Sequence, residues 1–472
     1  MKKKLIAILI IAVVLVAVLA AIVNTRFSKM AIVGTGYTAK IMCSSVFVSG
    51  RDPVDIANVD LLATKAYPIS FNVDRENKEV VASVFGLFAS RAVYREGLGC
   101  TVVVDMSDEE IDALAAAVPE PPEPLPSDVL WPDGSKVDPG NPPPGVDVEK
   151  LDRALDFAFN DPAPDRPVGT RAVVVVHGGG IIGERYAPGF SKDTPLLGWS
   201  MTKSVNNALV GILVKQGKLD INEPAPVPEW KDPADPRSKI TLDQLLRMSS
   251  GLTFVEEYED NITSDCNLML FTVRDMAAYA ASKELEGEPD SIWSYSSGTT
   301  NIISRIVRHT VGGSDADYLA FPRRELLDKL GMNSTVIEPD PSGTLVGSSY
   351  MYATARDWAR FGLLFLNDGV WHGERILPEG WVEYCATPTP KAPQGGYGAQ
   401  FWLNAGSPDN PKDRWMPEIP TDAYSARGHD GQYVTIIPSM DLVVVRLGFT
   451  PNHLESWDHQ QFLLYVLEAV GK

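Results

Sequence analysis

The sequence contains one place where a serine and a lysine lie three residues apart, in Gly198-Trp-Ser200-Met-Thr-Lys203. Apolar residues follow at helical spacing as far as Gly217, so the spacing predicts that Ser200 and Lys203 begin a helix and share one face. Burial and the positive end of a helix both favour a neutral amine, which could take the serine proton. The pair predicts acyl transfer with Ser200 as nucleophile, although a serine that merely caps a helix is also common.

Two later elements could serve the same chemistry. Tyr295-Ser-Ser297 precedes a helical pattern, and His429-Asp-Gly431 runs directly into a strand-like stretch, where His429 would lie at a strand edge facing a cleft. A tyrosine hydroxyl in a cationic pocket can relay a proton, and Ser297 can hydrogen-bond a substrate amide. Each also has an ordinary structural interpretation, so the prediction depends on their order along the chain after Ser200 and Lys203.

A cluster of acidic residues follows the Ser-Ser-Gly-Leu segment. Five lie within ten positions, and Tyr258 lies among them. Such a run is usually a solvated surface. If this loop lines the cleft, it would favour a substrate with a free amino group, which Tyr258 could contact. The acidic residues are Glu256, Glu257, Glu259, Asp260 and Asp265.

The elements that must position these residues follow a clear order. A helical pattern over 148–159 leads into a buried-type strand over 172–176 and a glycine-rich hairpin tip. After a long and mostly helical middle, strands over 434–437 and 442–447 precede a final helix near 457–470. This order predicts an α+β domain, with an antiparallel sheet flanked by helices and an inserted helical region. The site is expected in the cleft between them.

Three segments together resemble a known family. LLGWSMTKSVNNALVGILVKQGKLD, ITLDQLLRMSSGL and WSYSSGTTNIISRIV are similar to, and similarly placed as, segments of the class C β-lactamase-related serine hydrolases, which include DD-peptidases, esterases and 6-aminohexanoate-dimer hydrolases. The resemblance covers roughly residues 146–472 and implies a β-lactamase/transpeptidase-like fold. It implies Ser200 as acyl-forming nucleophile, Lys203 and Tyr295 as the proton-handling pair, and the backbone N–H groups of Ser200 and Gln432 as oxyanion hole. No metal or organic cofactor is required by this chemistry.

Two departures from the family pattern concern the substrate. The family's lactamases carry lysine where His429 stands and asparagine where Ser297 stands, and losing the fixed cation weakens recognition of a carboxylate. The variants found here look more like the 6-aminohexanoate-dimer hydrolase and esterase branch. The expected substrate is therefore a small amide or ester. A DD-peptidase or β-lactamase acting on cell-wall peptides or β-lactams is the alternative.

Two other classes of protein share parts of this pattern. His177-Gly-Gly-Gly180 looks like the oxyanion motif of α/β-hydrolases, but the chain contains no G-x-S-x-G, and Ser200 follows too closely for the elements of that fold. A catalytically silent protein that binds cell wall or a partner domain with the same fold is the other class. The presence of Ser200, Lys203 and Tyr295 argues against it.

The N-terminus predicts a membrane segment. Residues 5–23 are 19 uninterrupted apolar residues preceded by three lysines, which is long enough to span most of a bilayer core of about 30 Å. A cleaved signal peptide usually has a shorter apolar region, so an uncleaved anchor is favoured over cleavage. The lysine bias places the N-terminus in the cytoplasm and the catalytic part on the periplasmic or extracellular side.

That compartment permits disulfides. Cys43, Cys100, Cys266 and Cys385 are an even number, and two bridges could form, each within one folded unit. For Cys266 and Cys385, the interpretation as small buried hydrophobes is equally good.

Composition limits the partners of the chain, and proline density indicates how the chain is divided. The 472 residues include 42 basic and 61 acidic ones, and the resulting charge of −19 opposes nucleic-acid binding. Ten prolines between 119 and 145 favour an extended connector. We therefore expect four parts: an anchor or signal over 1–24, a small membrane-proximal α/β region over 25–117, a proline-rich linker over 118–145, and the serine hydrolase domain over 146–472. The second part has strand-like runs over 41–49, 80–88 and 101–105, and nothing in it resembles a site.

Overall fold

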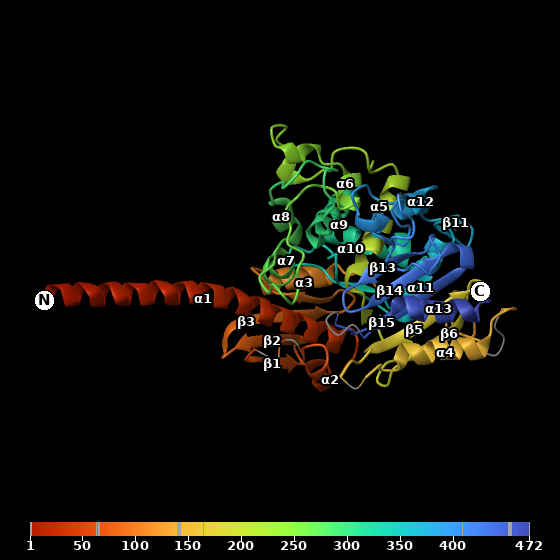
Figure 1. Cartoon of the computed structure of the whole chain (residues 1–472), viewed down its shortest axis with the longest axis horizontal. Coiled ribbons are helices and arrows are strands. Elements are labelled where there is room, and N and C mark those ends of the chain that lie inside the picture. The colour runs from red at the N-terminus through yellow and green to blue at the C-terminus, as the bar shows by residue number, and fades with distance from the viewer. Residues whose placement is uncertain are drawn as a thin grey trace.

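The computed structural model describes residues 2–471 apart from 63, 65–66, 139–142, 164, 408 and 452–455, and for residues 2–24 it describes the helical backbone alone. The C-terminal part is built on a six-stranded antiparallel sheet of order β12-β13-β14-β15-β5-β6 (Figure 1). Because β15 pairs with β5, the two ends of this part meet at the centre of the sheet. The strands are β5 (Thr170–His177), β6 (Gly180–Tyr186), β12 (Trp402–Leu403), β13 (Tyr424–Gly428), β14 (Gln432–Ile437) and β15 (Leu442–Gly448).

Helices cover both faces of this sheet, which is why its central strands are nearly continuous runs of valine and isoleucine. Val173 and Val175 of β5 pack with α4 (Val148–Phe159) and α13 (His459–Ala469) on one face. Val174 and Val176 join the main core on the other face, where α11 (Ala355–Leu366) lies against the sheet. The predicted helix over 148–159, the glycine-tipped hairpin, the two late strands and the final helix are all confirmed.

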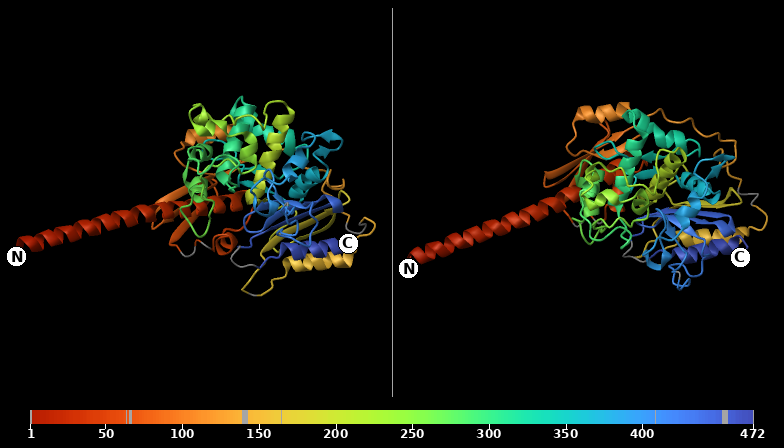
Figure 2. Two further views of the ribbon diagram at one scale, coloured as in Figure 1. Left: turned by 45° about the horizontal axis from the view of Figure 1, so that its top comes forward. Right: turned by 90° about the horizontal axis from the view of Figure 1, so that it is seen from above.

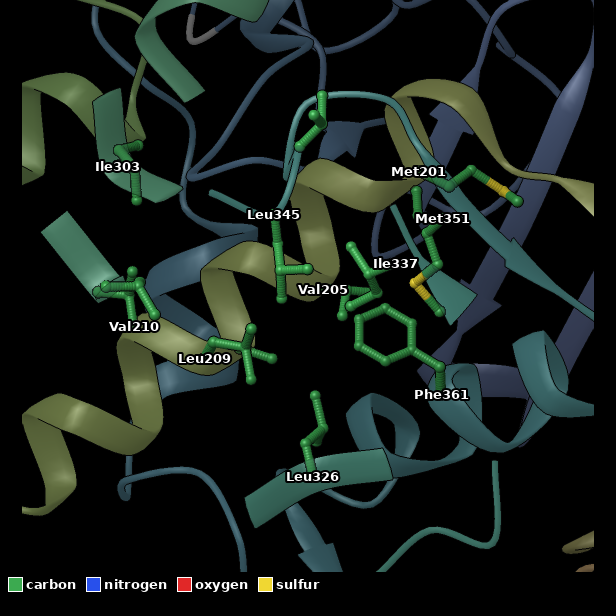
Figure 3. Close-up of a cluster of buried hydrophobic side chains, with 14 of the residues drawn as sticks. Met201, Val205, Leu209, Val210, Ile303, Leu326, Ile337, Leu345, Met351 and Phe361 are labelled. Atoms are coloured by element: carbon green, nitrogen blue, oxygen red, sulfur yellow. The ribbon is translucent and has the colours of Figure 1, made fainter. Parts of the chain in front are cut away.

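A helical region is inserted between β6 and the late strands and forms the upper part of the molecule in Figure 1. At its centre is α5 (Thr202–Lys215), in which residues 202–213 are all buried. Figure 3 shows side chains of α9, β8, β9 and α11 packed around α5. The predicted α+β architecture with an inserted helical region is therefore correct. The other helices are α6 (Leu242–Leu246), α7 (Asp265–Thr272), α8 (Met276–Ala281), α9 (Ser297–Val311), α10 (Asp315–Pro322) and α12 (Trp381–Ala386).

Short strands complete this part. A three-stranded sheet of order β7-β9-β8 brings the segment before α5 against the segment before α11, and β10 pairs with β11 in a small hairpin. These strands are β7 (Leu196–Leu197), β8 (Val336–Ile337), β9 (Met351–Ala353), β10 (Val370–Trp371) and β11 (Glu374–Arg375).

The N-terminal region is a four-stranded antiparallel meander packed on the C-terminal half of a long helix. Helix α1 (Lys2–Phe47) runs out from the body at its N-terminal end, and its other end crosses the meander (Figures 1 and 2). A strand predicted for 41–49 is wrong, because Ala39, Met42, Cys43 and Val46 lie at helical spacing and are buried against the sheet. The remaining elements are α2 (Pro53–Asn58), β1 (Ile69–Asp74), β2 (Glu79–Val84), β3 (Leu87–Arg95), β4 (Gly99–Val102) and α3 (Asp108–Ala116).

A buried ion pair joins this region to the body. Lys40 on α1 contacts Glu338, which follows β8, and both side chains are almost fully buried. Glu338 also accepts hydrogen bonds from Ser44 Oγ at 2.7 Å and from the backbone N–H of Cys100 at 2.6 Å. Gly99 is required beside it, because a Cβ there would lie 2.5 Å from the Glu338 side chain. The region is thus fixed to the body instead of standing apart from it.

The proline-rich segment is also held against the body. Its Trp131 is buried beneath the guanidinium of Arg360, which donates hydrogen bonds to the carbonyls of Pro132 and Gly134 at 2.9 and 3.0 Å. Arg356 donates to the carbonyl of Ser135 at 2.8 Å. The segment therefore lies along α11 over these residues. It is not extended throughout, because the Ser135 N–H donates to the Pro126 carbonyl at 2.9 Å and closes a turn.

The cysteines divide into one pair and two single residues. Cys43 of α1 and Cys100 of β4 form a disulfide, with Cα atoms 6.1 Å apart. The second bridge that the even count permitted is wrong: Cys266 and Cys385 are free and buried in α7 and α12. Burial raises the pKa of both thiols, and Cys385 donates its S–H to Asn207 at 3.2 Å. These two residues are packing groups, the other interpretation that the sequence left open.

The predicted membrane segment over 5–23 lies outside the residues whose side chains the structure describes. Within the part of the chain that the structure describes, no helix is both long and apolar enough to cross a membrane. The apolar run over 5–23 belongs to the portion of α1 for which only the helical backbone is described.

Candidate active site

Ser200 lies in a tight turn between β7 and α5. A 3-10 turn (Trp199–Met201) precedes the α-helix, and Trp199 adopts a left-handed backbone conformation with φ of 47°. Such strain is held only where the surroundings determine it. Here the Gly198 N–H donates to the Met351 carbonyl at 2.9 Å, and a Cβ on Gly198 would lie 2.3 Å from Trp358. The turn places Ser200 at the helix start, as the spacing predicts.

Lys203 lies one turn further, and its ammonium has three hydrogen-bond acceptors. Its Nζ lies 3.0 Å from each of Ser200 Oγ, Ser297 Oγ and the Ser348 carbonyl oxygen. The side chain is buried, and as an ammonium it donates to all three acceptors; the neutral amine keeps two N–H donors and has a lone pair for the Ser200 proton. The amine is therefore fixed within proton-transfer distance of the candidate nucleophile. The Ser348 carbonyl lies 145 residues away in sequence, and no sequence motif indicated it.

Tyr295 lies beside the same ammonium. Lys203 Nζ is 4.9 Å from the centre of the Tyr295 ring, and the ring packs against Tyr397 and Trp402 with centroid distances of 5.8 and 5.3 Å. The structure thus brings Ser200, Lys203 and Tyr295 together, as the sequence predicts. The assignment of Tyr295 as a proton relay stays a prediction.

Ser297 connects Lys203 to a carboxylate that the sequence did not assign to this position. As the first residue of α9, Ser297 donates from Oγ to Glu256 Oε1 at 2.5 Å and from its backbone N–H to Oε2 at 2.8 Å. Tyr258 donates its hydroxyl to the same carboxylate at 2.7 Å. Ser297 is 1% exposed and is not among the residues that line the cavity, and its Oγ is bonded to both Lys203 and Glu256. The hydrogen bond between Ser297 and a substrate amide stays a prediction.

The acidic loop is only partly turned toward the cleft. Glu256 is occupied by Ser297 and Tyr258, and Asp265 begins α7, where it pairs with Lys283 at 2.5 Å and accepts from Tyr279 at 2.7 Å. Of the five acidic residues, Glu259 lines the cavity that contains Ser200. We expected the acidic loop to line the cleft, but among its five acidic residues only Glu259 is found at the cavity.

His429 lies in the turn between β13 and β14 and lines the same cavity. Its Nε2 is 2.9 Å from Glu259 Oε1 and 3.4 Å from Asp430 Oδ1, and its ring packs against Tyr258, with centroids 4.7 Å apart and planes tilted by 49°. Burial alone would lower the pKa of His429, but the charge of Asp430 and the hydrogen bond to Glu259 raise it overall. Potential ligand atoms of Glu259, His429 and Asp430 all lie within 4.8 Å of one another, so this cluster could hold a cation.

The raised pKa of His429 gives a pH dependence that can be measured. Replacing His429 with glutamine removes the charge, and the stability advantage of the wild type should be complete below about pH 6.5, the ordinary histidine pKa. It should disappear as pH rises through the folded-state pKa. Because Glu259 is 55% exposed, the advantage should be at most about 1 kcal/mol. Urea unfolding between pH 5.5 and 9 measures it, and an advantage that grows with pH would contradict the assignment.

Gln432 supports the turn with its side chain. Its amide donates to the carbonyls of His429, Asp430 and Gly448 at 3.0, 3.1 and 2.7 Å, and its Oε1 accepts from the Gly448 N–H at 2.9 Å. Opposite it, Gly428 packs so closely on the Ser200 turn that a Cβ would lie 2.1 Å from the Gly198 carbonyl. The β13–β14 turn is therefore held against the nucleophile. The oxyanion role of the backbone N–H groups of Ser200 and Gln432 stays a prediction.

Gly431 and Arg446 stabilise the β13–β14 turn. Gly431 has φ of 80°, and a Cβ there would lie 2.3 Å from Nη1 of the fully buried Arg446, which donates to the Gly431 carbonyl at 2.6 Å. Arg446 also donates to Thr450 Oγ1 at 2.6 Å and lies over the Trp457 ring. Burial lowers the pKa of Arg446 to about 9.

Replacing Gly431 with alanine should therefore both destabilise the protein and impair the site. We expect a loss of about 1–3 kcal/mol from backbone strain and the clash with Arg446, with at least a tenfold fall in kcat/KM as the turn shifts. Gly189→Ala is the matched control, because Gly189 has a similar φ of 85° but open space around it. Urea unfolding and steady-state kinetics test both variants, and equal effects at the two positions would contradict this explanation.

A cavity of about 550 Å³ lies beside Ser200 and His429. It contains Ser200 together with Ser349, Tyr258 and the His429 turn, and a wall from the N-terminal region, including Tyr37 and Asp60, closes one side. Part of the region over 25–117 therefore lies beside Ser200, although nothing in the sequence of that region resembles a site. Sequence alone could not show it, because the wall forms only when α1 packs on α7.

The fold, the half-buried Ser200 at a substrate-sized cavity and the buried Lys203 beside it are those of a serine hydrolase. The sequence profile of the beta-lactamase family matches residues 165–453, and the chain belongs to that family.

Known relatives agree with this class. The chain is 27% identical over 304 residues to the 6-aminohexanoate-dimer hydrolase of Paenarthrobacter ureafaciens, covering 60% of this chain and 73% of that one. Among solved structures, a Bacillus anthracis protein provisionally assigned as a 6-aminohexanoate-dimer hydrolase matches with a TM-score of 0.54 and 24% identity over 68% of this chain and 81% of its own. A family VIII carboxylesterase matches with a TM-score of 0.51 and 15% identity, over 68% and 96% respectively. The two structural likenesses concern the fold alone.

Proposed function

We propose that the protein hydrolyses a small amide or ester in two steps. Ser200 Oγ attacks the carbonyl carbon while its proton passes to Lys203 or Tyr295. The bond to the amine or alcohol then breaks, and the leaving group takes that proton. Water attacks the acyl-enzyme, releases the acid and returns the proton to Ser200. The observation that carries this proposal is the 3.0 Å contact between Lys203 Nζ and the Oγ of Ser200, a residue that lines the cavity.

Developing negative charge on the carbonyl oxygen would be stabilised by backbone N–H groups. The Ser200 N–H lies at the start of α5, and the β13–β14 turn over 428–432 packs against it. We assign the oxyanion hole to the Ser200 N–H and an N–H of this turn, with Gln432 as the donor that the family resemblance implies.

The charge distribution favours a neutral or cationic substrate over one with a carboxylate. Glu259 and Asp430 flank His429, where a lactamase would carry a lysine, so two carboxylates outnumber the one imidazole at this end of the cavity. A β-lactam or D-alanine carboxylate would be repelled there. An ammonium group could instead pair with Glu259 and lie near the Tyr258 ring. This supports an amide or ester with a free amino group over the DD-peptidase or β-lactamase alternative.

The N-terminal segment supports a membrane-anchored enzyme. The apolar run over 5–23 and the three lysines before it favour an uncleaved helix with the catalytic part on the periplasmic or extracellular side. Carbonate extraction of membranes together with protease accessibility of the catalytic part tests this placement. Release by carbonate alone would contradict it.

One substrate panel tests the proposed function. Short amides, short esters and a chromogenic cephalosporin are compared on the wild type and on Ser200→Ala, with each amine-bearing substrate paired with its acetylated form. We expect Ser200-dependent hydrolysis of amides or esters, slow or absent cephalosporin turnover, and a preference for the free amine that Glu259→Gln removes. Rapid cephalosporin hydrolysis would favour the lactamase alternative. A preference that survives Glu259→Gln would contradict the assigned amine site.

A further inference from the structure

The cavity around Ser200 extends well beyond the reacting groups, along helix α1. From Trp199 and Ser200 it continues between α1 on one side and α7 with its preceding loop on the other. The α1 wall is formed by Phe27, Met30, Gly34 and Tyr37, whereas Ile262 and Phe271 form the facing wall. The side chains along this arm are mostly apolar.

The α1 wall of this arm is built by a part of the chain that lies outside the family match. Residues 27–69 contribute to the cavity, but the beta-lactamase family profile begins at residue 165. The wall is held rigidly in place, because the buried Lys40–Glu338 pair and the Tyr37–Phe271 edge contact at 5.4 Å fix α1 against the body. One wall of the arm therefore comes from a segment outside the family match, and the other comes from within it.

The outer end of the arm opens among exposed apolar side chains. Phe27 is 40% exposed, Leu62 57% and Tyr67 42%, and all three lie at the cavity. Clustered exposed apolar groups of this kind mark binding sites. Phe27 also lies only four residues beyond the apolar run over 5–23, which at 1.5 Å per residue is about 6 Å along the helix. Under the proposed anchoring, this end faces the membrane surface.

We propose that the arm binds a hydrocarbon chain, so that the substrate of this enzyme is an ester or amide of a medium-length or long acyl chain. This rests on the proposed function and names its substrate class. The carbonyl would lie at Ser200, the chain would extend between α1 and α7 toward Phe27, and the polar leaving group would lie toward Glu259 and His429. The volume of about 550 Å³ is within the range of roughly 300–1,000 Å³ for small-molecule sites.

Chain-length preference is the property to measure. The full-length protein is reconstituted in phosphatidylcholine vesicles and given 4-nitrophenyl acetate, hexanoate and decanoate. Since each buried methylene contributes about 0.8 kcal/mol, or about a fourfold gain, the wild type should prefer decanoate to acetate by at least tenfold in kcat/KM. A ratio near one would overturn the proposal.

Variants separate binding in the arm from partition into the vesicles. Met30→Trp narrows the α1 wall and should lower the decanoate-to-acetate ratio at least fivefold, and Ile262→Trp should do the same from the facing wall. Lys29→Trp is the matched control, because Lys29 is exposed, adjacent to Met30 and outside the cavity lining. The decanoate-to-acetate ratio of Lys29→Trp should equal that of the wild type, because partition of the substrates into the vesicles contributes equally to both. Unchanged ratios in both Met30→Trp and Ile262→Trp would overturn the proposal.

Two further comparisons complete the test. Ser200-dependent hydrolysis of acetate without any chain-length preference would overturn this inference and leave the proposed function intact, whereas no Ser200-dependent hydrolysis of any ester would overturn both. Monoacylglycerol embedded in the vesicles then distinguishes the source of the chain. Ser200-dependent release of its fatty acid supports a membrane lipid, and hydrolysis of the nitrophenyl decanoate alone supports a soluble acyl compound.

Discussion

Replacing Lys203 with methionine should lower kcat on the preferred ester or amide by about 10³- to 10⁴-fold, and Ser200→Ala should lower it at least as far. Methionine keeps the apolar stem but has no amine to accept the proton of Ser200, whose Oγ lies 3.0 Å from Lys203 Nζ. The double variant should be no slower than the slower single variant, because residues that act as a unit are not additive. Steady-state and single-turnover kinetics measure these effects.

The control lies on the same helix. Lys215→Met changes an exposed lysine at the end of α5 and should leave kcat within a factor of two. Urea unfolding of Lys203→Met should show a loss of about 1–3 kcal/mol, because the buried Ser348 carbonyl loses a hydrogen-bond donor. If Lys203→Met retained near-normal turnover, Lys203 could not be the base.

The second large effect concerns stability. Lys40→Met leaves the buried Glu338 carboxylate without its cation and should destabilise the protein by about 3–5 kcal/mol. Ser44 and the Cys100 N–H still donate to that carboxylate, but two hydrogen bonds do not replace the lost charge. Since the pair holds α1 at the cavity, hydrolysis of long-chain substrates should fall more steeply than hydrolysis of acetate. Urea unfolding followed by tryptophan fluorescence measures the stability.

A double variant separates the burial of charge from loss of packing. Lys40→Met with Glu338→Leu removes both charges and should recover a large part of the lost stability, because an apolar pair of similar volume often replaces a buried ion pair without cost. Lys78→Met is the surface control, since Lys78 pairs with Glu96 at 3.6 Å and is half exposed. A double variant less stable than either single variant would show that packing, and not charge, dominates here.

The reacting residues could be predicted from sequence because their geometry is local. Ser200 and Lys203 are three residues apart at the start of a helix, and that spacing alone places both side chains on one face. The sheet was also predictable, because the valine runs of β5 and β15 are typical of buried strands and the Gly178–Gly180 tip marks the hairpin. Periodicity needs only neighbouring residues, so it predicts these elements without knowledge of the tertiary fold.

The parts that failed depend on contacts between distant segments. Glu256 reaches Ser297 across 41 residues, and the predicted amine site lost Glu256 and Asp265 because their partners are set by tertiary packing. The run from Ile41 was predicted as a strand because β-branched and small residues suit strands, but burial against the meander favours the helix. The same packing brings α1 to the cavity, although the proline-rich segment suggested a separate outer region.

Covalent labelling at Ser200 tests the central claim most directly. The full-length protein is treated with an alkyl fluorophosphonate and its intact mass is measured beside Ser200→Ala, with both proteins checked for native folding by circular dichroism. We predict one stoichiometric adduct on the wild type, located at Ser200 by peptide mapping, and none on Ser200→Ala. An adduct that forms equally on both proteins, or none on the folded wild type, would contradict an acyl-enzyme mechanism and favour a protein that binds without catalysis.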